Sequence, residues 1–373
     1  MVDLQQNFDE SLTEIATKNG LRLDRIVIAV SGGADSLALA FLLNNALRNS
    51  GTEIVALTVN HHLRTEADDE AEYVAKLMQK HNIKHRILHW NHPPLSAGIE
   101  TKAREARYNL LLDWCHRNNF SILMTAHHLR DQAETFLMRL QRGSGIDGLA
   151  SISAVSEREN IKIVRPLLKF EPQELRDFLT DKHIEWVEDA SNQCNDYLRV
   201  RVRKMLPILE QELGLTAAKI ASAATALGEA RDYFSEQVNK FIKNHCRNWY
   251  NYAWSFSPQT FVNLHKELQF RILSELIKII GCTEYPPEYQ AMQRLCSAVS
   301  EQNFTGCTLG GCEIIRFQNK IWIVPENKKN TNLSTEQWNK FADSHPEILK
   351  VGLPYKLRAY LYGKIGKAVE FEK

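Results

Sequence analysis

Six residues between a β-branched run and an apolar run combine the residue types that bind phosphate groups. The segment Ser31-Gly32-Gly33-Ala34-Asp35-Ser36 follows IVIAV at residues 26–30 and precedes an apolar helical pattern. Glycines expose backbone N–H groups to a ligand, and the free N–H groups of a helix start attract anions. Asp35 would repel phosphate directly, so we interpret it as a Mg²⁺ ligand, the ion bridging carboxylate and phosphate. An ordinary strand-to-helix turn with an Asp or Ser cap is the alternative.

A second group of reactive side chains stands in AHHLRDQAET, residues 126–135. His127 and Asp131 lie four residues apart around a predicted strand end and helix start, so they could share one face near the nucleotide. Asp131 suits Mg²⁺ or an ammonium, and His127 suits a phosphate contact or a proton shuttle. Glu134, one turn along, could also meet an ammonium. The alternative is that His127 and Asp131 only cap a helix and that Glu134 is solvated.

Arginines form two further candidate groups. Arg104 and Arg107 share a helical face and could clamp a triphosphate or an RNA, although a solvated Glu/Arg face is the rival interpretation. The densest basic cluster is Arg199, Arg201, Arg203 and Lys204. Net charge is only +1, from 46 basic and 45 acidic residues, so any nucleic-acid site must be a local patch. We expect some members of this cluster to meet RNA phosphates; a solvated helix start is the alternative for each.

The elements that must position these residues alternate between strand and helix. Such alternation predicts an α/β fold with a parallel sheet covered by helices on both faces. Ligands then bind at the carboxyl ends of the strands, where the loop 31–36 and Ala126-His127-His128 both lie. The predicted strands are 26–30, 54–59, 85–89, 122–126, 161–165 and 184–187; the predicted helices are 36–48, 67–81, 100–118, 131–141 and 172–182.

The pattern changes near Gly214, which predicts three parts. Residues 1–214 form the nucleotide-binding domain and open with an amphipathic helix on Phe8, Leu12 and Ile15. Residues 215–325 are mostly helical and end in a β-hairpin with Asn319-Lys320 near its tip. Residues 326–373 are a polar linker and a short C-terminal segment.

Length and composition fit an ordinary protein of two or more domains. The chain has 373 residues, 44% of them hydrophobic, and no run approaches the ~18 apolar residues of a membrane span. Its start carries acidic residues and no apolar core, so we expect no signal peptide and a cytoplasmic location. The seven scattered cysteines predict free thiols; Cys307 and Cys312 are better interpreted as buried thiols than as a metal or disulfide site.

The segment SGGADS matches SGGxDS, the signature of the PP-loop ATP pyrophosphatases, at every fixed position. Four more stretches occur in a characteristic order: VNHHLR at 59–64, ETKAREARYNLL at 100–111, AHHLRDQAETFLMRLQRGSGIDGL at 126–149, and EDASNQCNDYLRVRVRKMLP at 188–207. With them the chain resembles the tRNA(Ile)-lysidine synthetases, closely over roughly residues 20–215.

The resemblance implies a Rossmann-like PP-loop domain, then a helical domain and a small C-terminal part. It also implies a reaction. ATP adenylates the C2 oxygen of the wobble cytidine in the CAU-anticodon isoleucine tRNA, and free L-lysine then displaces AMP through its ε-amine. The codon read changes from AUG to AUA. ATP and Mg²⁺ are the implied small molecules, and a homodimer stays open.

On this resemblance each candidate residue receives a role. Asp35, His127 and Asp131 are catalytic, with Asp35 and Asp131 as Mg²⁺ ligands, and Arg199, Arg201, Arg203 and Lys204 contact tRNA. The ATP-binding residues are Ser31, Gly32, Gly33, Ala34, Asp35 and Ser36; the nucleotide or lysine contacts are His61, Arg104, Arg107 and Glu134.

Two positions depart from the family pattern. Arg130 stands where relatives often have the first acid of HHxDDQAET, and Val200 stands where RNxxR has its Asn. If Asp131 is the working acid, the first departure leaves activity in place. Rival functions are another PP-loop enzyme, such as a tRNA thiolase or an amide synthetase, or a non-catalytic tRNA-binding protein. A thiolase would use a CxxC pair, which the sequence lacks, and the complete SGGADS favours catalysis.

Overall fold

The computed structural model describes residues 3–63, 65–92, 99–188, 198–249, 253–283 and 286–326. The chain divides into two compact units, Met1–Arg231 and Asp232–Lys373, and the helix α9 (Ala217–His245) runs from one into the other. The linker and segment predicted for 326–373 lie outside the described residues from position 327 onward. No helix among the described residues is long and apolar enough to cross a membrane.

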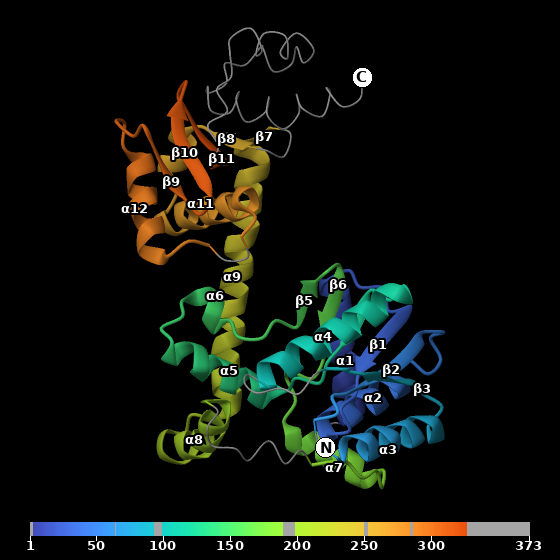
Figure 1. Ribbon diagram of the computed structural model, residues 1–373. Coiled ribbons are helices and arrows are strands. Elements are labelled where there is room, and N and C mark those ends of the chain that lie inside the picture. Colours follow the sequence, from blue (N-terminus) through green and yellow to red (C-terminus); the bar gives the residue numbers. More distant parts are fainter. Residues whose placement is uncertain are drawn as a thin grey trace, which may run out of the picture. The chain divides into compact units, whose positions relative to one another are not determined.

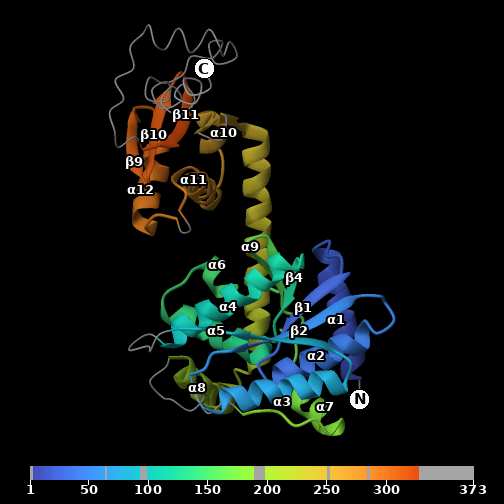
Figure 2. The ribbon, with the colours of Figure 1, turned by 45° about the vertical axis from the view of Figure 1, so that its right-hand side comes forward.

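A six-stranded sheet forms the centre of the first unit (Figures 1 and 2). Its order is β3-β2-β1-β4-β6-β5, and every pairing is parallel except that of β5 with β6. The carboxyl ends of the parallel strands therefore meet at one edge, as the sequence predicts. The strands are β1 (Arg25–Ala29), β2 (Glu53–Asn60), β3 (Lys84–His89), β4 (Ile122–Met124), β5 (Val155–Arg158) and β6 (Ile161–Val164).

Helices cover both faces of this sheet. Successive residues of a strand point to opposite faces, and here both sets are apolar. Ile26 and Ile28 pack with four helices on one face. Val27 points to the other face and packs with Leu111 and Leu112 of α4 (Ile99–Arg117). The predicted α/β class is confirmed. The four helices are α1 (Leu4–Lys18), α2 (Ala34–Ala46), α3 (Ala67–Lys80) and α7 (Pro172–Asp181).

Three more helices of this unit lie outside the main sheet layers. They are α5 (Leu129–Gln141), the single turn α6 (Ile146–Leu149) and α8 (Leu198–Leu213). Buried Ala133 of α5, Leu206 of α8 and Ile220 of α9 form one apolar cluster. This packing brings α8 against the helix that follows β4.

One predicted strand is wrong and one strand was not predicted. Residues 184–187 form no strand: the N–H of Ile184 returns to Leu179 O at the end of α7, and Val187 N donates to Gly32 O. The place beside β6 is taken by β5, which pairs antiparallel with it. The two adjacent left-handed residues Glu159 and Asn160 make the tight turn of this hairpin.

The second unit contains a five-stranded antiparallel sheet in the order β7-β8-β11-β10-β9. The predicted hairpin is confirmed: β10 pairs with β11 around Gln318 and Asn319, both in the left-handed region. The other three strands, β7, β8 and β9, were not predicted, because the sequence analysis expected mostly helix followed by a single hairpin. Its elements are β7 (Cys246–Trp249), β8 (Ala253–Phe256), α10 (Pro258–Val262), α11 (Lys266–Gly281), α12 (Tyr289–Ser300), β9 (Gly306–Leu309), β10 (Cys312–Phe317) and β11 (Lys320–Pro325).

The six described cysteines are free thiols. Cys312 is buried, as predicted, but Cys307 is exposed on the edge strand β9. Within the described ranges, no cluster of three or more His, Cys, Asp or Glu side chains could hold a metal ion.

Candidate active site

The glycine-rich loop joins β1 to α2 at the carboxyl edge of the sheet. Gly32 has a φ of +88°, and a Cβ there would lie 3.1 Å from Val74 Cγ2, so both conformation and space require glycine. Ser36 is buried and serves the loop itself, since its Oγ accepts from Ser31 N at 3.1 Å and donates to Gly33 O at 2.9 Å. The first turn of α2 has no side-chain cap. Its N–H groups are therefore available to an anion.

Asp35 projects from this first turn toward the start of α5. Its Oδ1 is buried without a hydrogen-bond partner, and its Oδ2 lies 3.6 Å from His128 Nε2. Burial raises the pKa of Asp35, neighbouring His128 opposes this shift, and nearby Asp131 adds to it. An oxygen buried without a donor suits a cation. Asp35 thus fits the Mg²⁺ role implied by the family.

Asp131 is fixed by its place in the first turn of α5. Its Oδ2 accepts from His128 N at 3.0 Å, while His128 Nδ1 accepts from Asp131 N at 3.3 Å, which is a reciprocal cap. Burial raises the pKa of Asp131, but the neighbouring His128, Arg199 and His127, together with the hydrogen bond from His128 N, outweigh burial and hold the pKa below its usual range. Asp131 is therefore a carboxylate whose oxygens already have donors.

His128 is a site residue that the sequence analysis did not assign. Its Nε2 lies 3.6 Å from both Asp35 Oδ2 and Asp131 Oδ2. The neighbouring His127 was assigned instead, and only the cap geometry of α5 shows that the second histidine of AHH faces Asp35. A polar residue directly before the helix was the signal that could have identified it.

Glu134 is the most deeply buried charge of the site, with a side chain 1% exposed. Arg199 Nε contacts its Oε2 at 2.8 Å, and Arg203 Nε contacts its Oε1 at 2.8 Å. Arg199 also reaches Asp131 Oδ1 at 3.3 Å. These two arginines, four residues apart on α8, thus face inward, whereas Arg201 and Lys204 are exposed. We call Asp35, His128, Asp131, Glu134, Arg199 and Arg203 the acidic half of the site.

A second set of side chains at the same edge carries positive charge. Burial lowers the pKa of His127 to about 3; Asp131 opposes this shift, while Arg165, Arg104 and Arg107 add to it. His127 is therefore neutral near pH 7, and its Nδ1 lies 3.0 Å from Thr125 Oγ1. We call His127, Arg104, Arg107 and Arg165 the basic half. His127 lies within the electrostatic reach of both halves.

The guanidinium groups of the basic half lack carboxylate partners. Arg104 and Arg107 lie 5.6 and 5.5 Å from the ring centre of Tyr108. Burial lowers the pKa of Arg107 and of Arg165, and Arg165 Nε is buried without a hydrogen-bond partner. Arg165 follows β6 and was not assigned from the sequence. Among the described residues, none of these three arginines forms an ion pair with an acid.

His61 extends the basic half beyond β2. Burial, helped by the nearby Arg107 and His92, lowers the pKa of His61 to about 4. Its Nδ1 is buried without a partner. This neutral imidazole, which the sequence assigned as a nucleotide or lysine contact, lies close enough to Arg107 to sense its charge.

The two departures from the family pattern are accommodated structurally. Arg130 turns away from Asp131, and its Nε pairs with Glu171 Oε2 at 3.1 Å at the start of α7. Val200 is buried on α8 beside inward-facing Arg199. Neither side chain occupies the place of an acidic-half residue.

Comparisons find similar proteins over most of the chain. A family model for the PP-loop domain matches residues 4–209. The tRNA(Ile)-lysidine synthase of Wolbachia pipientis wMel is 35% identical over 316 residues, covering 82% of this chain and 72% of that protein. The tRNA(Ile)-lysidine synthase of Ruegeria pomeroyi is 33% identical over 325 residues, covering 84% and 74%.

One solved structure is similar in fold. The U34-tRNA thiolase NcsA from Methanococcus maripaludis, determined with its 4Fe-4S cluster, superposes with a TM-score of 0.50 at 18% identity. The match covers 60% of this chain and 79% of that one. At this identity the likeness concerns the fold alone.

Proposed function

The chain belongs to the tRNA(Ile)-lysidine synthase family, and from that premise we propose how the two halves of its site form lysidine. The substrates are ATP, free L-lysine and the isoleucine tRNA with a CAU anticodon. The C2 oxygen of the wobble cytidine attacks the α-phosphorus of ATP and expels pyrophosphate. The lysine ε-amine then attacks C2, loses a proton and expels AMP.

The basic half binds the phosphates in this proposal. Negative charge builds up on the pyrophosphate as it leaves, and preorganised cations stabilise such charge strongly where water is excluded. Arg104, Arg107 and Arg165 supply that charge, and the loop 31–36 supplies backbone N–H donors. The supporting observation is that Arg107 and Arg165 are desolvated, whereas Arg104 is exposed, and that none of the three has an acidic partner among the described residues.

The acidic half holds cations and positions α5. Asp35 would hold Mg²⁺, with Asp131 beside it, and the ion would offset phosphate charge. Both Glu134 oxygens already bind arginines, so we assign Glu134 a positioning role and place the lysine ammonium near Asp35, whose Oδ1 has no hydrogen-bond partner. His128 Nε2 lies 3.6 Å from one oxygen each of Asp35 and Asp131.

His127 is the proposed acceptor of the proton that the ε-amine must lose. Its pKa of about 3 is too low for an efficient base near pH 7. Phosphate anions bound to Arg104, Arg107 and Arg165 would cancel much of the repulsion that these arginines exert on a charged imidazole. The pKa of His127 would therefore rise when nucleotide is bound, by the part that the arginines contribute, while burial, the larger cause of the low pKa, remains. The proximity of His127 to both halves is the observation that carries this proposal.

Transfer RNA contacts are proposed for the outward face of α8. Arg201 and Lys204 are exposed there, and phosphate contacts of this kind give affinity that falls with salt. Arg199 and Arg203, included in the same cluster by sequence, bind Glu134, so we expect them to act mainly through the acidic half.

The function is tested by incubating the protein with ATP, radiolabelled lysine and transcripts of the CAU-anticodon tRNA. We expect label in a modified cytidine and stoichiometric AMP and pyrophosphate. A transcript with uridine at the wobble position is the matched control and should stay unlabelled. Pyrophosphate release without lysine incorporation, as another PP-loop enzyme would give, contradicts the proposal.

A further inference from the structure

A cluster of aromatic and imidazole rings stands at the carboxyl ends of β2 and β3, beside the basic half of the site, with which it shares His61. We call it the aromatic platform. Its rings contact one another: His62 and His89 stack with centroids 5.1 Å apart, and Trp90 lies 4.1 Å from His92. His61 meets Trp90 edge-on at 5.7 Å. The platform comprises His61, His62, His89, Trp90 and His92.

Hydrogen bonds hold these rings in place. His62 Nε2 lies 2.9 Å from His89 Nδ1, and His62 Nδ1 lies 3.0 Å from Asp68 Oδ1. Trp90 N donates to Asn60 O at 2.9 Å, which continues the β2–β3 pairing. His62 has a φ of 51°, a conformation that residues other than glycine rarely adopt. A surface arrangement this constrained points to a binding role.

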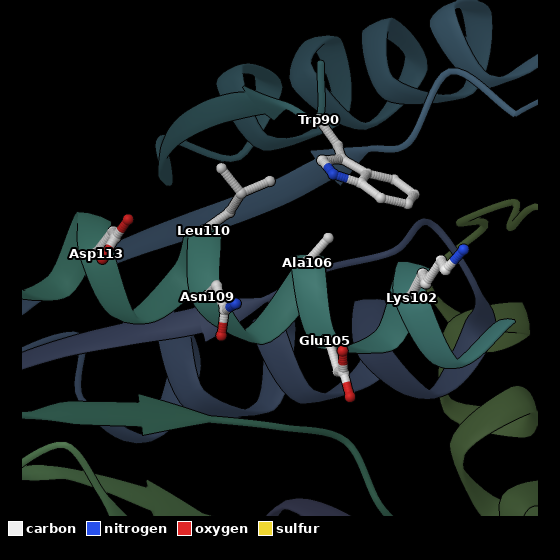
Figure 3. A pocket seen from close by; sticks show the side chains of 7 residues that line it. All are labelled: Trp90, Lys102, Glu105, Ala106, Asn109, Leu110 and Asp113. Carbon is white, nitrogen blue, oxygen red and sulfur yellow. The ribbon is translucent and has the colours of Figure 1, made fainter. Parts of the chain in front are cut away.

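The platform is open to solvent on the side of α4. His62 and His89 are exposed and Trp90 is half-buried. An open groove of about 340 Å³ lies between the indole and α4, lined by Trp90, Lys102, Glu105, Ala106, Asn109, Leu110 and Asp113. Figure 3 shows the indole across this groove from Lys102 and Ala106. A flat apolar ligand could lie against the ring, with amide and charged groups along the opposite wall.

The aromatic platform lies at the same edge of the sheet as the glycine-rich loop but not next to it. The strand β3 is two strands away from β1, which leads into the glycine-rich loop, so the separation is roughly 10 Å across the sheet. His61 joins the platform to the basic half, because it contacts Trp90 and senses Arg107. A substrate with several linked planar groups could engage both places at once.

We infer that the aromatic platform stacks a nucleobase of the tRNA anticodon loop while the wobble cytidine is in the site. The inference rests on the proposed function. Sequence-specific RNA recognition targets unpaired loop bases and stacks them on Trp and His rings. The adenine of ATP has the same chemistry, but the platform stands at the edge strand and opens to solvent, which favours the larger substrate.

The test compares Trp90→Ala with Trp90→Phe in steady-state lysidine formation. Loss of one stacked base should raise the KM for tRNA by roughly 5- to 150-fold in Trp90→Ala. Trp90→Phe retains a stacking ring and should stay within about 3-fold of wild type. The KM values for lysine and ATP and the kcat at saturating tRNA should be unchanged. Melting temperatures serve as the folding control.

A binding measurement gives the second readout. Titration with a CAU anticodon stem-loop RNA should quench tryptophan emission in the wild type, and most of the quench should vanish in Trp90→Phe. An unchanged KM for tRNA in Trp90→Ala would overturn the inference, as would a rise confined to the KM for ATP or for lysine. A wild-type protein that forms no lysidine refutes the proposed function instead, so the two failures are distinguishable.

Discussion

The acidic and basic halves of the site balance their charges in opposite ways. In the acidic half, buried Glu134 faces two arginines, and Asp131 accepts from Arg199 and from a backbone N–H. In the basic half, the pKa values of Arg107 and Arg165 are lowered by burial, and no described acid pairs with them. Burying an uncompensated charge is costly. The difference indicates that the fold itself neutralises Glu134 in the acidic half, whereas an anionic ligand must neutralise the buried arginines of the basic half.

The largest effect is expected for Asp35, which belongs to the acidic half but has an oxygen without a partner. Asp35→Ala should lower tRNA-dependent pyrophosphate release by about 1000-fold, because the proposed metal ligand is lost. Its melting temperature should stay near that of wild type, since Oδ1 makes no hydrogen bond. Asp69→Asn, an exposed acid on α3, is the control. Full activity in Asp35→Ala would remove the metal role.

The second largest effect is expected in the free energy of unfolding, which should respond differently to substitutions in the two halves. Glu134→Gln removes the acid that Arg199 and Arg203 share, although Arg199 keeps its contact with Asp131. Urea denaturation should therefore show a loss of roughly 1–3 kcal/mol in the free energy of unfolding, partly screened by solvent at the arginines. Arg107→Gln removes a charge that no described acid balances and should leave the free energy of unfolding unchanged or raise it. Equal losses in both variants would break the contrast.

The free energy of unfolding should depend on pH, because buried histidines are held neutral in the folded protein. Burial lowers the pKa of His61 and His85 to about 4 and that of His127 to about 3, against about 6.5 when unfolded. The stability linked to these groups is complete above pH 6.5 and falls as the pH drops from 6.5 toward 4. The upper limit is about 1.4 kcal/mol per pH unit for each histidine, and partial exposure reduces it.

His85 and His127 sharpen this test because only one belongs to the site. His85 is held by Thr58 within the sheet, at 2.9 Å. His85→Gln should flatten the decline of melting temperature between pH 7 and 5 whether or not a nucleotide is present. A non-hydrolysable ATP analogue should reduce the share of this decline in melting temperature that comes from His127. If the analogue leaves the pH profile of the wild type unaltered, bound phosphate does not raise the pKa of His127.

The smallest effect is expected at Arg130, which belongs to neither half. Arg130→Asp restores an acid that relatives often carry and breaks only the half-exposed pair with Glu171. Such pairs contribute roughly 0–1 kcal/mol. Lysidine formation should stay within about 2-fold of wild type. A tenfold change in rate would mean that Arg130 acts on the acidic half after all.

Short-range sequence patterns predicted the parts of the site that a contiguous segment builds. The loop 31–36 and its flanking strand and helix were predictable because glycine conformation and helix-start chemistry are local. The ion pairs of Glu134 were not, since its partners lie 65 and 69 residues away and meet it only when α8 packs on α5. The choice between His127 and His128 depends on cap geometry, which two identical neighbouring residues do not encode.

The strand errors have the same origin. Residues 184–187 are apolar enough for a strand, but the place beside β6 is taken by β5, whose exposed end carries Glu157 and Arg158. The strand β5 pairs with β6 because a tight turn joins the two strands, whereas residues 184–187 are more distant in the sequence. Arg165 was missed because one arginine after a strand has no distinctive local pattern.

We conclude that an anion completes the basic half, whereas the ion pairs of Glu134 in the acidic half form without a ligand. The direct measurement is calorimetric binding of a non-hydrolysable ATP analogue to wild type, Arg107→Gln and Glu134→Gln, at a temperature where all three are folded. The account predicts roughly 10- to 100-fold weaker binding for Arg107→Gln, from the loss of a desolvated charge-assisted contact, and near wild-type binding for Glu134→Gln. The reverse order of affinities would contradict it.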